Sequence, residues 1–302
     1  MASAGEELDE INRIHDDDPA QAAARLRALD SSALPRESLP LAAFLYNHVL
    51  GEKIGMWSDA AQHIDRLHHR HTDVPPAVMI HAAVADELAG RDSTTARAAV
   101  AAASSDAVAE CAIGLRRLSF TQDRMDTATF AAVLRDLVQR AQALTTGTPF
   151  DTQLAAGLNN ATSRLLDLDP NVGDVAFCDA LQAGAAQALR FWRAAGNWVN
   201  HERALYLVAL TANRIGAHVQ ARDAARQGLD VIAANGSEDV DRAFLLLQLA
   251  GAHQRLGEDT ASRAARRDAQ AIAANWTEAW LTEWFAGEET KLFGPAAKTV
   301  NP

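Results

Sequence analysis

The sequence contains little cysteine and few aromatic residues, and each shortage excludes a class of protein. Only two cysteines, Cys111 and Cys178, occur in 302 residues, which excludes a disulfide-stapled secreted scaffold. Aromatic residues make up 6% of the chain, whereas apolar residues make up 48%. Much of that apolar share is alanine, which favours helices and lets them approach closely. The composition therefore indicates an all-helical protein.

The chain also lacks an excess of basic residues, a secretion signal and a long apolar run. Its net charge is −11, so the whole-chain field repels nucleic-acid phosphates and anionic lipid surfaces. Residues 1–18 are acidic and lack the basic-then-apolar order of a signal peptide. No run of about 18 apolar residues could cross a bilayer. We therefore expect a cytoplasmic protein with neither a nucleic-acid nor a membrane partner.

No motif of defined catalytic or nucleotide-binding chemistry is present in the sequence. It has no phosphate-cradling glycine-rich loop and no Gly-x-Ser-x-Gly elbow, and neither cysteine has a histidine at helical spacing. Asp167, Asp169 and Asn171 begin like a calcium loop, but Gly173 comes one place late and Cys178 replaces the closing glutamate. We therefore predict a non-enzymatic protein without a cofactor.

Four histidines crowd the end of one predicted helix, at positions 63, 68, 69 and 71. His68 and His71 are suitably spaced to share a transition metal, which would need a third ligand nearby. Imidazoles at a helix C-terminus also interact favourably with the helix dipole while they remain in water. We adopt this second interpretation and predict no metal site.

Repetition is the most informative feature that the chain does contain. Residues 204–232 and 243–272 read as two copies of one helix-turn-helix unit, with apolar and small residues recurring at spacings of three to five. No segment shows the alternation of a strand. A single hairpin is too narrow to bury its own apolar face, so such units must stack on their neighbours. We predict an all-α fold, an α-solenoid of about seven helical hairpins closed by a C-terminal capping helix.

We expect a single solenoid over residues 1–302, divided into segments at its helix caps and its proline and glycine turns. Asp18 and Pro19 predict the start of the second helix. The predicted segments are an N-terminal capping hairpin (1–35), two hairpins (38–103), irregular helical hairpins (104–200), the two clearest repeats (201–274), a capping helix (275–290) and a tail (291–302).

These units resemble tetratricopeptide repeats (TPR), which have a leucine and a small residue in the first helix, a glycine at the turn and alanines in the second helix. The match is best in Leu205, Val208, Ala209, Gly216, Ala221 and Ala225, and next best around Gly257; Gly55 and Gly90 mark two further copies. Residues 104–203 show almost nothing of the TPR pattern except Leu168-Asp169-Pro170, which matches the end of a repeat.

The resemblance implies a right-handed superhelix whose concave face, lined by first helices, binds an extended peptide or a partner's helix. Family members that hold a C-terminal carboxylate use Lys, Arg and Asn on successive first helices. Here only residues 203–214 are polar enough to hold an anion, so we do not expect a clamp for chaperone tails.

Aromatic residues beside arginine and asparagine, the composition of binding hot spots, cluster around residues 191–206. The alternative is that these rings pack one hairpin on the next. The predicted function is a protein–protein interaction scaffold that binds a peptide or partner protein in the concave groove. The predicted contacts are Tyr46, Trp192, Trp198, Asn200, His201, Arg203, Tyr206, Asn213 and Arg214.

Two other functions stay open at this point. One is a ligand-sensing regulator or enzyme with a small-molecule pocket in residues 104–198. The other is a self-assembling module that uses the terminal helix, where Trp276, Trp280 and Trp284 recur every four residues. These tryptophans either seal the last repeat or, if exposed, form a homodimer face.

Overall fold

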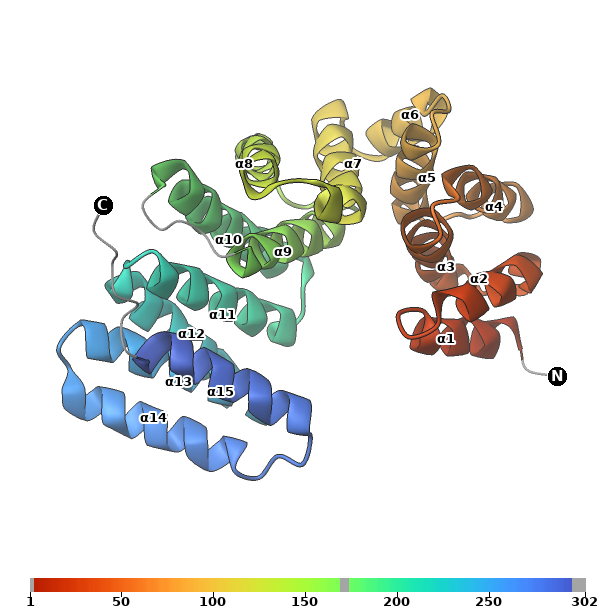
Figure 1. Cartoon of the computed structure of the whole chain (residues 1–302). Helices are drawn as coiled ribbons and strands as arrows, with labels where there is room; N and C mark the ends of the chain where they lie inside the picture. Colours follow the sequence, from red (N-terminus) through yellow and green to blue (C-terminus); the bar gives the residue numbers. More distant parts are fainter. Residues whose placement is uncertain (1–2, 169–173, 295–302) are drawn as a thin grey trace. The chain divides into compact units, whose positions relative to one another are not determined.

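The computed structural model describes residues 3–168 and 174–294, and it is helical throughout (Figure 1). Helix accounts for 82% of the structure, and no strand occurs in the described ranges. This confirms the all-helical prediction. The proposed Leu168-Asp169-Pro170 ending, the calcium-like run and the tail lie partly or wholly outside these ranges.

The chain divides into two units, Met1–Ala161 and Thr162–Pro302, which we call unit one and unit two. Unit one contains α1 (Ala4–Ile14), α2 (Pro19–Ala28), the 3-10 turns η1 (Ser31–Ala33) and η2 (Arg36–Ser38), α3 (Leu39–Leu45), the π-helix η3 (Tyr46–Lys53), α4 (Trp57–Arg70), α5 (Pro76–Leu88), α6 (Thr94–Ala103), α7 (Asp106–Thr121), the 3-10 turn η4 (Gln122–Arg124) and α8 (Thr127–Ala143). Helix α9 (Asp151–Asp167) crosses the division. Unit two continues with α10 (Val175–Ala195), α11 (Trp198–Arg214), α12 (His218–Asn235), α13 (Asp239–Arg255), α14 (Asp259–Ala273) and α15 (Ala279–Phe293).

Side-chain caps fix several helix starts. The Asp18 carboxylate accepts a hydrogen bond from the Gln21 N–H at 2.9 Å, and Pro19 occupies the first turn of α2. This confirms the predicted start. At the start of α11, Asn197 and Asn200 cap each other's backbone N–H groups in a reciprocal pair. The sequence around residue 197 thus fixes where the polar helix α11 begins.

Three glycine turns share one geometry. Gly90, Gly216 and Gly257 have φ values of 69°, 82° and 76°, in the left-handed region that favours glycine. In each turn the N–H of the residue after the glycine donates to the carbonyl five positions earlier, as in Ala217 to Ala212 at 2.8 Å and Glu258 to His253 at 2.9 Å. This is the Schellman helix ending, so three of the predicted repeat turns are structurally equivalent.

The fourth turn, at Gly55, is longer by one residue because the helix before it is not an α-helix. Its φ is 81°, yet the Met56 N–H donates to Leu50 rather than to Gly51, at 2.7 Å. The first helix of the predicted hairpins over residues 38–103 consists of α3 followed by the π-helix η3. The absence of a side chain at Gly51 lets the Trp57 ring lie against this π-helix, since a Cβ there would meet the ring at 2.4 Å.

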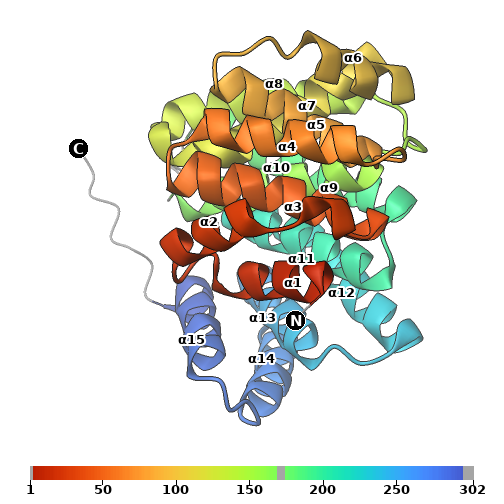
Figure 2. The ribbon, with the colours of Figure 1, turned by 90° about the vertical axis from the view of Figure 1, so that its right-hand side faces the viewer.

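Within each unit the helices pack neighbour to neighbour. Figure 2 shows α1, α2, α4 and α5 of unit one lying one above another. In unit two, α11 contacts α12, α13 contacts α14, and the alternate helices α11, α13 and α15 also contact in series. The unit-two core is formed mainly by the buried apolar side chains of α11 and α13. Among the described helices, none is both long enough and apolar enough to cross a membrane.

Candidate functional site

Side chains of α11, α13 and α15 enclose a polar groove in unit two, which we call the α11–α15 groove. It comprises two cavities of about 170 Å³ and about 380 Å³ that share Leu210, Arg214, Glu288 and Lys291. The other polar residues that line it are Asp167, Asn213, His218, Gln248 and Arg255. Helix α15 closes the groove by direct packing: Gly251 lacks a side chain, and a Cβ there would lie 2.8 Å from Leu292 Cδ2.

A hydrogen-bond network fixes the floor of the groove. Asn213 Nδ2 donates to the Gln248 backbone carbonyl at 2.9 Å and to Gln248 Oε1 at 3.0 Å. His218 Nδ1 lies 3.4 Å from Asn213 Oδ1. Gln248 is buried and accepts through its oxygen, and its amide nitrogen is directed at the Tyr206 hydroxyl.

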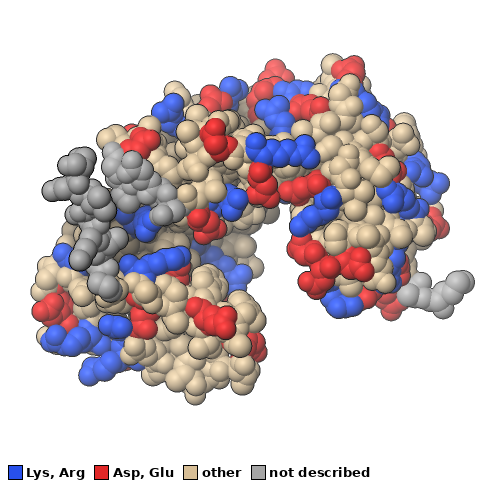
Figure 3. All heavy atoms as spheres, in the orientation of Figure 1, with Lys and Arg blue, Asp and Glu red and all other residues tan. Residues whose placement is uncertain are grey.

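The groove is locally basic in an acidic chain. It contains the cations Arg214, Arg255 and Lys291 against the carboxylates of Asp167 and Glu288. Glu288 is buried and is neutralised by Lys291 Nζ at 2.6 Å. Figure 3 shows basic and acidic side chains interspersed over the face of unit two that it presents. The local excess of positive charge favours an anionic ligand.

His218 is held in its neutral form at the edge of this groove. Burial, followed by the nearby positive charge of Arg255, lowers the pKa of the His218 imidazole. A neutral imidazole can donate through one ring nitrogen and accept through the other. Near neutral pH the positive charge therefore comes from the two arginines and Lys291 rather than from His218.

Two of the predicted contact residues, Asn213 and Arg214, lie in the α11–α15 groove. Tyr206 lies close to it, edge-on to the Phe244 ring with the centroids 6.1 Å apart. Burial, reinforced by the carboxylates of Glu288 and Asp241, raises the pKa of the Tyr206 hydroxyl. That hydroxyl is buried beside the Gln248 amide, so Tyr206 supports the floor of the groove rather than its surface.

The remaining predicted residues of unit two serve other contacts. Arg203 Nε donates to Asp241 at 2.8 Å, and His201 Nε2 accepts from Arg193 at 3.1 Å. Asn200 belongs to the α11 cap, and Trp198 packs half-buried against the core. Trp192 is half-buried in the last turn of α10. The structure therefore gathers only part of the predicted set into one groove.

Tyr46 belongs to unit one and is completely buried there. Its ring stacks on His63 with the centroids 4.7 Å apart. Burial raises the pKa of the Tyr46 hydroxyl to about 12 and lowers the pKa of His63 to about 4. In this structure Tyr46 offers packing to the core and no exposed contact.

The other histidines of residues 63–71 do not converge. His71 Nε2 lies 2.8 Å from the Ser31 backbone carbonyl, while the rings of His68 and His69 lie 5.8 Å apart at the exposed end of α4. Within the described residues, the histidines of this run form no group of three ligands.

A buried carboxyl that the sequence analysis missed lies beside Arg203. Glu202 is fully buried, and neither of its oxygens completes a hydrogen bond within the described part of the chain. Burial, followed by the nearby Asp241, raises the pKa of Glu202 to about 9. A helical pattern could have found it, because Glu202 lies three residues before Leu205 and seven before Ala209, on the apolar face of α11.

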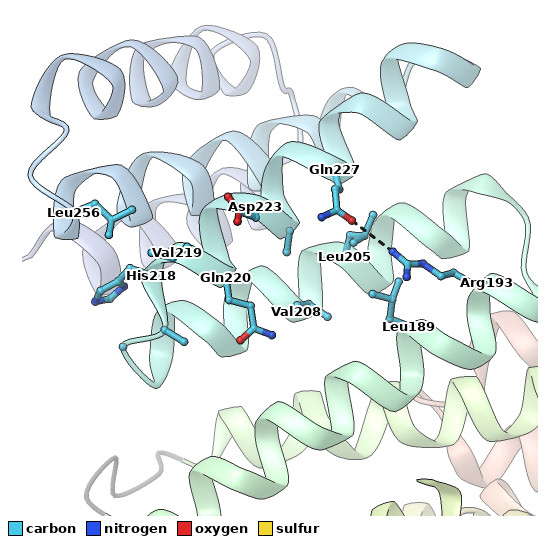
Figure 4. Close-up of a pocket in the computed structure, with 13 residues that line it drawn as sticks. Leu189, Arg193, Leu205, Val208, His218, Val219, Gln220, Asp223, Gln227 and Leu256 are labelled. Atoms are coloured by element: carbon cyan, nitrogen blue, oxygen red, sulfur yellow. Dashed lines mark hydrogen bonds between the residues drawn. The ribbon is translucent and has the colours of Figure 1, made fainter. Parts of the chain in front are cut away.

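A second cavity of unit two is larger and more apolar. It has a volume of about 790 Å³ and lies between α10, α11 and the start of α12 (Figure 4). Leu189, Leu205 and Val208 line it, while Arg193 Nη2 donates to Gln227 Oε1 at 3.5 Å across one side. Its size and apolar lining are typical of small-molecule sites.

Comparison with known proteins assigns no family. No protein-family model matches the chain. A search of curated proteins finds no match. The α11–α15 groove and the larger cavity are therefore interpreted from their own chemistry.

Proposed function

We propose that this protein is a non-enzymatic, TPR-like interaction scaffold whose α11–α15 groove binds a carboxylate-bearing segment of a partner protein. One observation carries the proposal: three cations from three helices line one groove. Arg214 comes from α11, Arg255 ends α13, and Lys291 belongs to α15.

The donor set suits a carboxylate. Arginine presents N–H groups in a planar fork that matches two carboxylate oxygens, and hydrogen bonds to charged acceptors are stronger than neutral ones. Asn213 gives both of its Nδ2 hydrogens to Gln248, so it shapes the floor of the groove, and the donors to a ligand are the two arginines and Lys291.

The shape of the groove favours a peptide over a small free anion. The groove continues from one cavity into the next, and Leu210, Leu292 and Leu166 contribute apolar surface along it. A segment that places a carboxylate near Arg214 can therefore bury apolar side chains beside it.

A peptide array tests this proposal on the full chain. The array presents acidic, neutral and basic peptides, each as a free C-terminal acid and as an amide, and the bound peptides are then titrated by fluorescence anisotropy. We expect acidic peptides to be selected, with affinity that falls as salt increases. Arg214→Ala and Arg255→Ala should each weaken binding by about tenfold or more.

Arg267→Ala is the matched control, because Arg267 is exposed on α14 and does not line the groove. Binding that prefers basic or neutral peptides, or that falls equally in the Arg267 control, would refute the proposal. A difference between the acid and amide forms of one peptide would show whether the C-terminal carboxylate or an acidic side chain is bound.

The larger cavity supports a second candidate, a regulator that binds a small, mainly apolar molecule. Its leucine and valine lining and its volume of about 790 Å³ favour such a ligand, and Arg193 with Gln227 would orient a polar group. Thermal-shift screening against metabolites checks this candidate, since a ligand of the folded state raises the melting temperature. Val208→Trp, which fills the cavity, should abolish any such shift.

A further inference from the structure

Two histidines and an aspartate from separate segments of unit one converge where α1 ends. Asp16 Oδ2 lies 3.3 Å from His15 Nε2, and Asp16 Oδ1 lies 3.3 Å from His48 Nε2. All the candidate ligand atoms lie within 4.8 Å of one another. Tetrahedral zinc with bonds of about 2.05 Å holds its ligand atoms about 3.3 Å apart. Each histidine therefore already lies at this distance from one of the two Asp16 oxygens.

The other nitrogen of each imidazole has its own partner. His48 Nδ1 lies 2.5 Å from the Glu52 carboxylate, and His15 Nδ1 lies beside the Asn12 backbone carbonyl. Acceptors at both Nδ1 positions fix the proton there, so each neutral ring presents a lone pair from Nε2. Those lone pairs face the oxygens of a carboxylate. A carboxylate that faces two imidazole nitrogens attracts positive charge, which a metal ion would supply in competition with Lys53 and with protons on the imidazoles.

We propose that His15, Asp16 and His48 bind one divalent transition-metal ion, of which Zn²⁺ fits this donor set best, with Glu52 and the Asn12 carbonyl as outer partners. Two imidazoles and one carboxylate leave a fourth position for water, the arrangement of an open zinc site. Outer carboxylates and carbonyls on ligand histidines are a regular part of such sites.

The local fold holds the ligands in place before a metal arrives. The Phe44 ring stacks on His48 with the centroids 5.3 Å apart and the planes 9° from parallel. His48 and Glu52 both belong to the π-helix η3, a rare element that occurs often at functional sites. The two histidine side chains are 17% and 15% exposed, whereas Asp16 is 63% exposed. The site is thus ordered on its protein side and open to solvent at Asp16.

The Lys53 ammonium competes with a metal ion for Asp16, so the removal of this ammonium tests the proposed metal site. Its ammonium lies 2.9 Å from Asp16 Oδ1, where a metal would bind. Figure 3 shows that acidic side chains gather over α1 and the turn that follows it, so the surroundings favour positive charge. A metal ion must displace the Lys53 ammonium from Asp16, and removal of that ammonium should tighten metal binding.

Calorimetric titration of the full chain, free of any histidine tag, with ZnCl₂ tests the proposal, together with the absorption spectrum of bound Co²⁺. We expect one ion per chain and a Co²⁺ spectrum of low, near-tetrahedral coordination. His15→Ala and His48→Ala should each weaken binding by about 100-fold or more, and Glu52→Gln by about 10- to 100-fold. His69→Ala, which removes an exposed histidine of α4, should leave binding unchanged.

Lys53→Met should bind the metal more tightly than the natural chain, a result that a purely structural ion-pair cluster would not produce. Asp16→Asn serves where a histidine variant fails to fold, because Asp16 is largely exposed, and it too should lose the metal. Absence of stoichiometric Zn²⁺ or Co²⁺ binding, or binding that survives His15→Ala and Asp16→Asn, would show that protons and Lys53 alone hold the cluster together.

Discussion

Replacement of Glu202 by glutamine should remove a large pH dependence of stability. In the folded chain the pKa of Glu202 is raised from 4.5 to about 9, first by burial and then by Asp241. Between these two values the folded state keeps a proton that the unfolded state has released. The unfolded state thus binds fewer protons, and the free energy of unfolding falls as the pH rises.

The size of the effect follows from the shift. Glu202 interacts with the Asp241 carboxyl, so the shift belongs to this pair of carboxyls. Each pH unit between about 5 and 8.5 should lower the free energy of unfolding by about 1.4 kcal/mol for the one proton that the folded pair retains. At pH 7.5, which is three units above 4.5, the accumulated loss in free energy of unfolding is on the order of 4 kcal/mol. Glu202→Gln keeps the shape of the side chain and holds no titrating proton, so its stability gain over the natural chain should grow with pH.

Urea unfolding of both chains at half-unit steps from pH 5 to pH 8.5 measures this difference. The charged neighbours Arg203 and Glu238 are present in both chains, so their contributions largely cancel, whereas Asp241 titrates together with Glu202 and belongs to the measured difference. Glu283→Gln, at an exposed position of α15, is the control and should follow the natural chain. Parallel stability curves for the natural chain and Glu202→Gln would refute the assignment of a buried, protonated carboxyl.

Other substitutions test the turns and the terminal helix. Gly257→Ala should lower the free energy of unfolding by on the order of 1 kcal/mol or more, because φ is 76° at this position. Gly287→Ala, inside α15 with open space around it, should instead raise the free energy of unfolding by about 0.5–1 kcal/mol. Equal effects of the two substitutions in thermal unfolding would contradict the turn geometry. Trp280 is 64% exposed, so Trp280→Asp should leave the melting temperature unchanged. Loss of a dimer peak from a sizing column in the same variant would support self-assembly through α15.

Several elements could be predicted from the sequence because local chemistry decides them. Pro19 after an aspartate marks a helix start in almost any context, and glycine after an apolar helical stripe marks a left-handed ending, as at Gly216 and Gly257. The helical period of α11 also placed Asn213 and Arg214 on its polar side, where the groove lies. These signals span one or two turns of helix and need no tertiary information.

The features that the sequence analysis missed depend on contacts between distant residues. An α-helix and a π-helix have similar apolar stripes over one or two turns, so the sequence pattern does not distinguish η3 from an ordinary α-helix. His15 and His48 are 33 positions apart in the chain, and only the packing of α1 and α2 beside η3 brings them together. Tyr46 was chosen for its residue type, which does not distinguish a buried ring from an exposed one.

The terminal tryptophans show both of the roles that the sequence left open. Trp284 lies 4.2 Å from Phe244, measured between ring centroids, and Trp276 stacks on the same ring at 6.1 Å. The Trp284 contact attaches α15 to α13, and the Trp276 contact attaches the segment that precedes α15. Trp280 and Trp284 are nevertheless 64% and 46% exposed, so the same helix also presents apolar surface to solvent.

Hydrogen–deuterium exchange of the full chain, with and without the tightest acidic peptide from the array, tests the central claim most directly. The account predicts slower exchange in the last two turns of α11 and α13 and in the second half of α15, where Arg214, Arg255 and Lys291 lie. Exchange in α4 and α5 should stay the same. Protection confined to α10 and α12, or to unit one, would contradict the claim that the α11–α15 groove binds the partner.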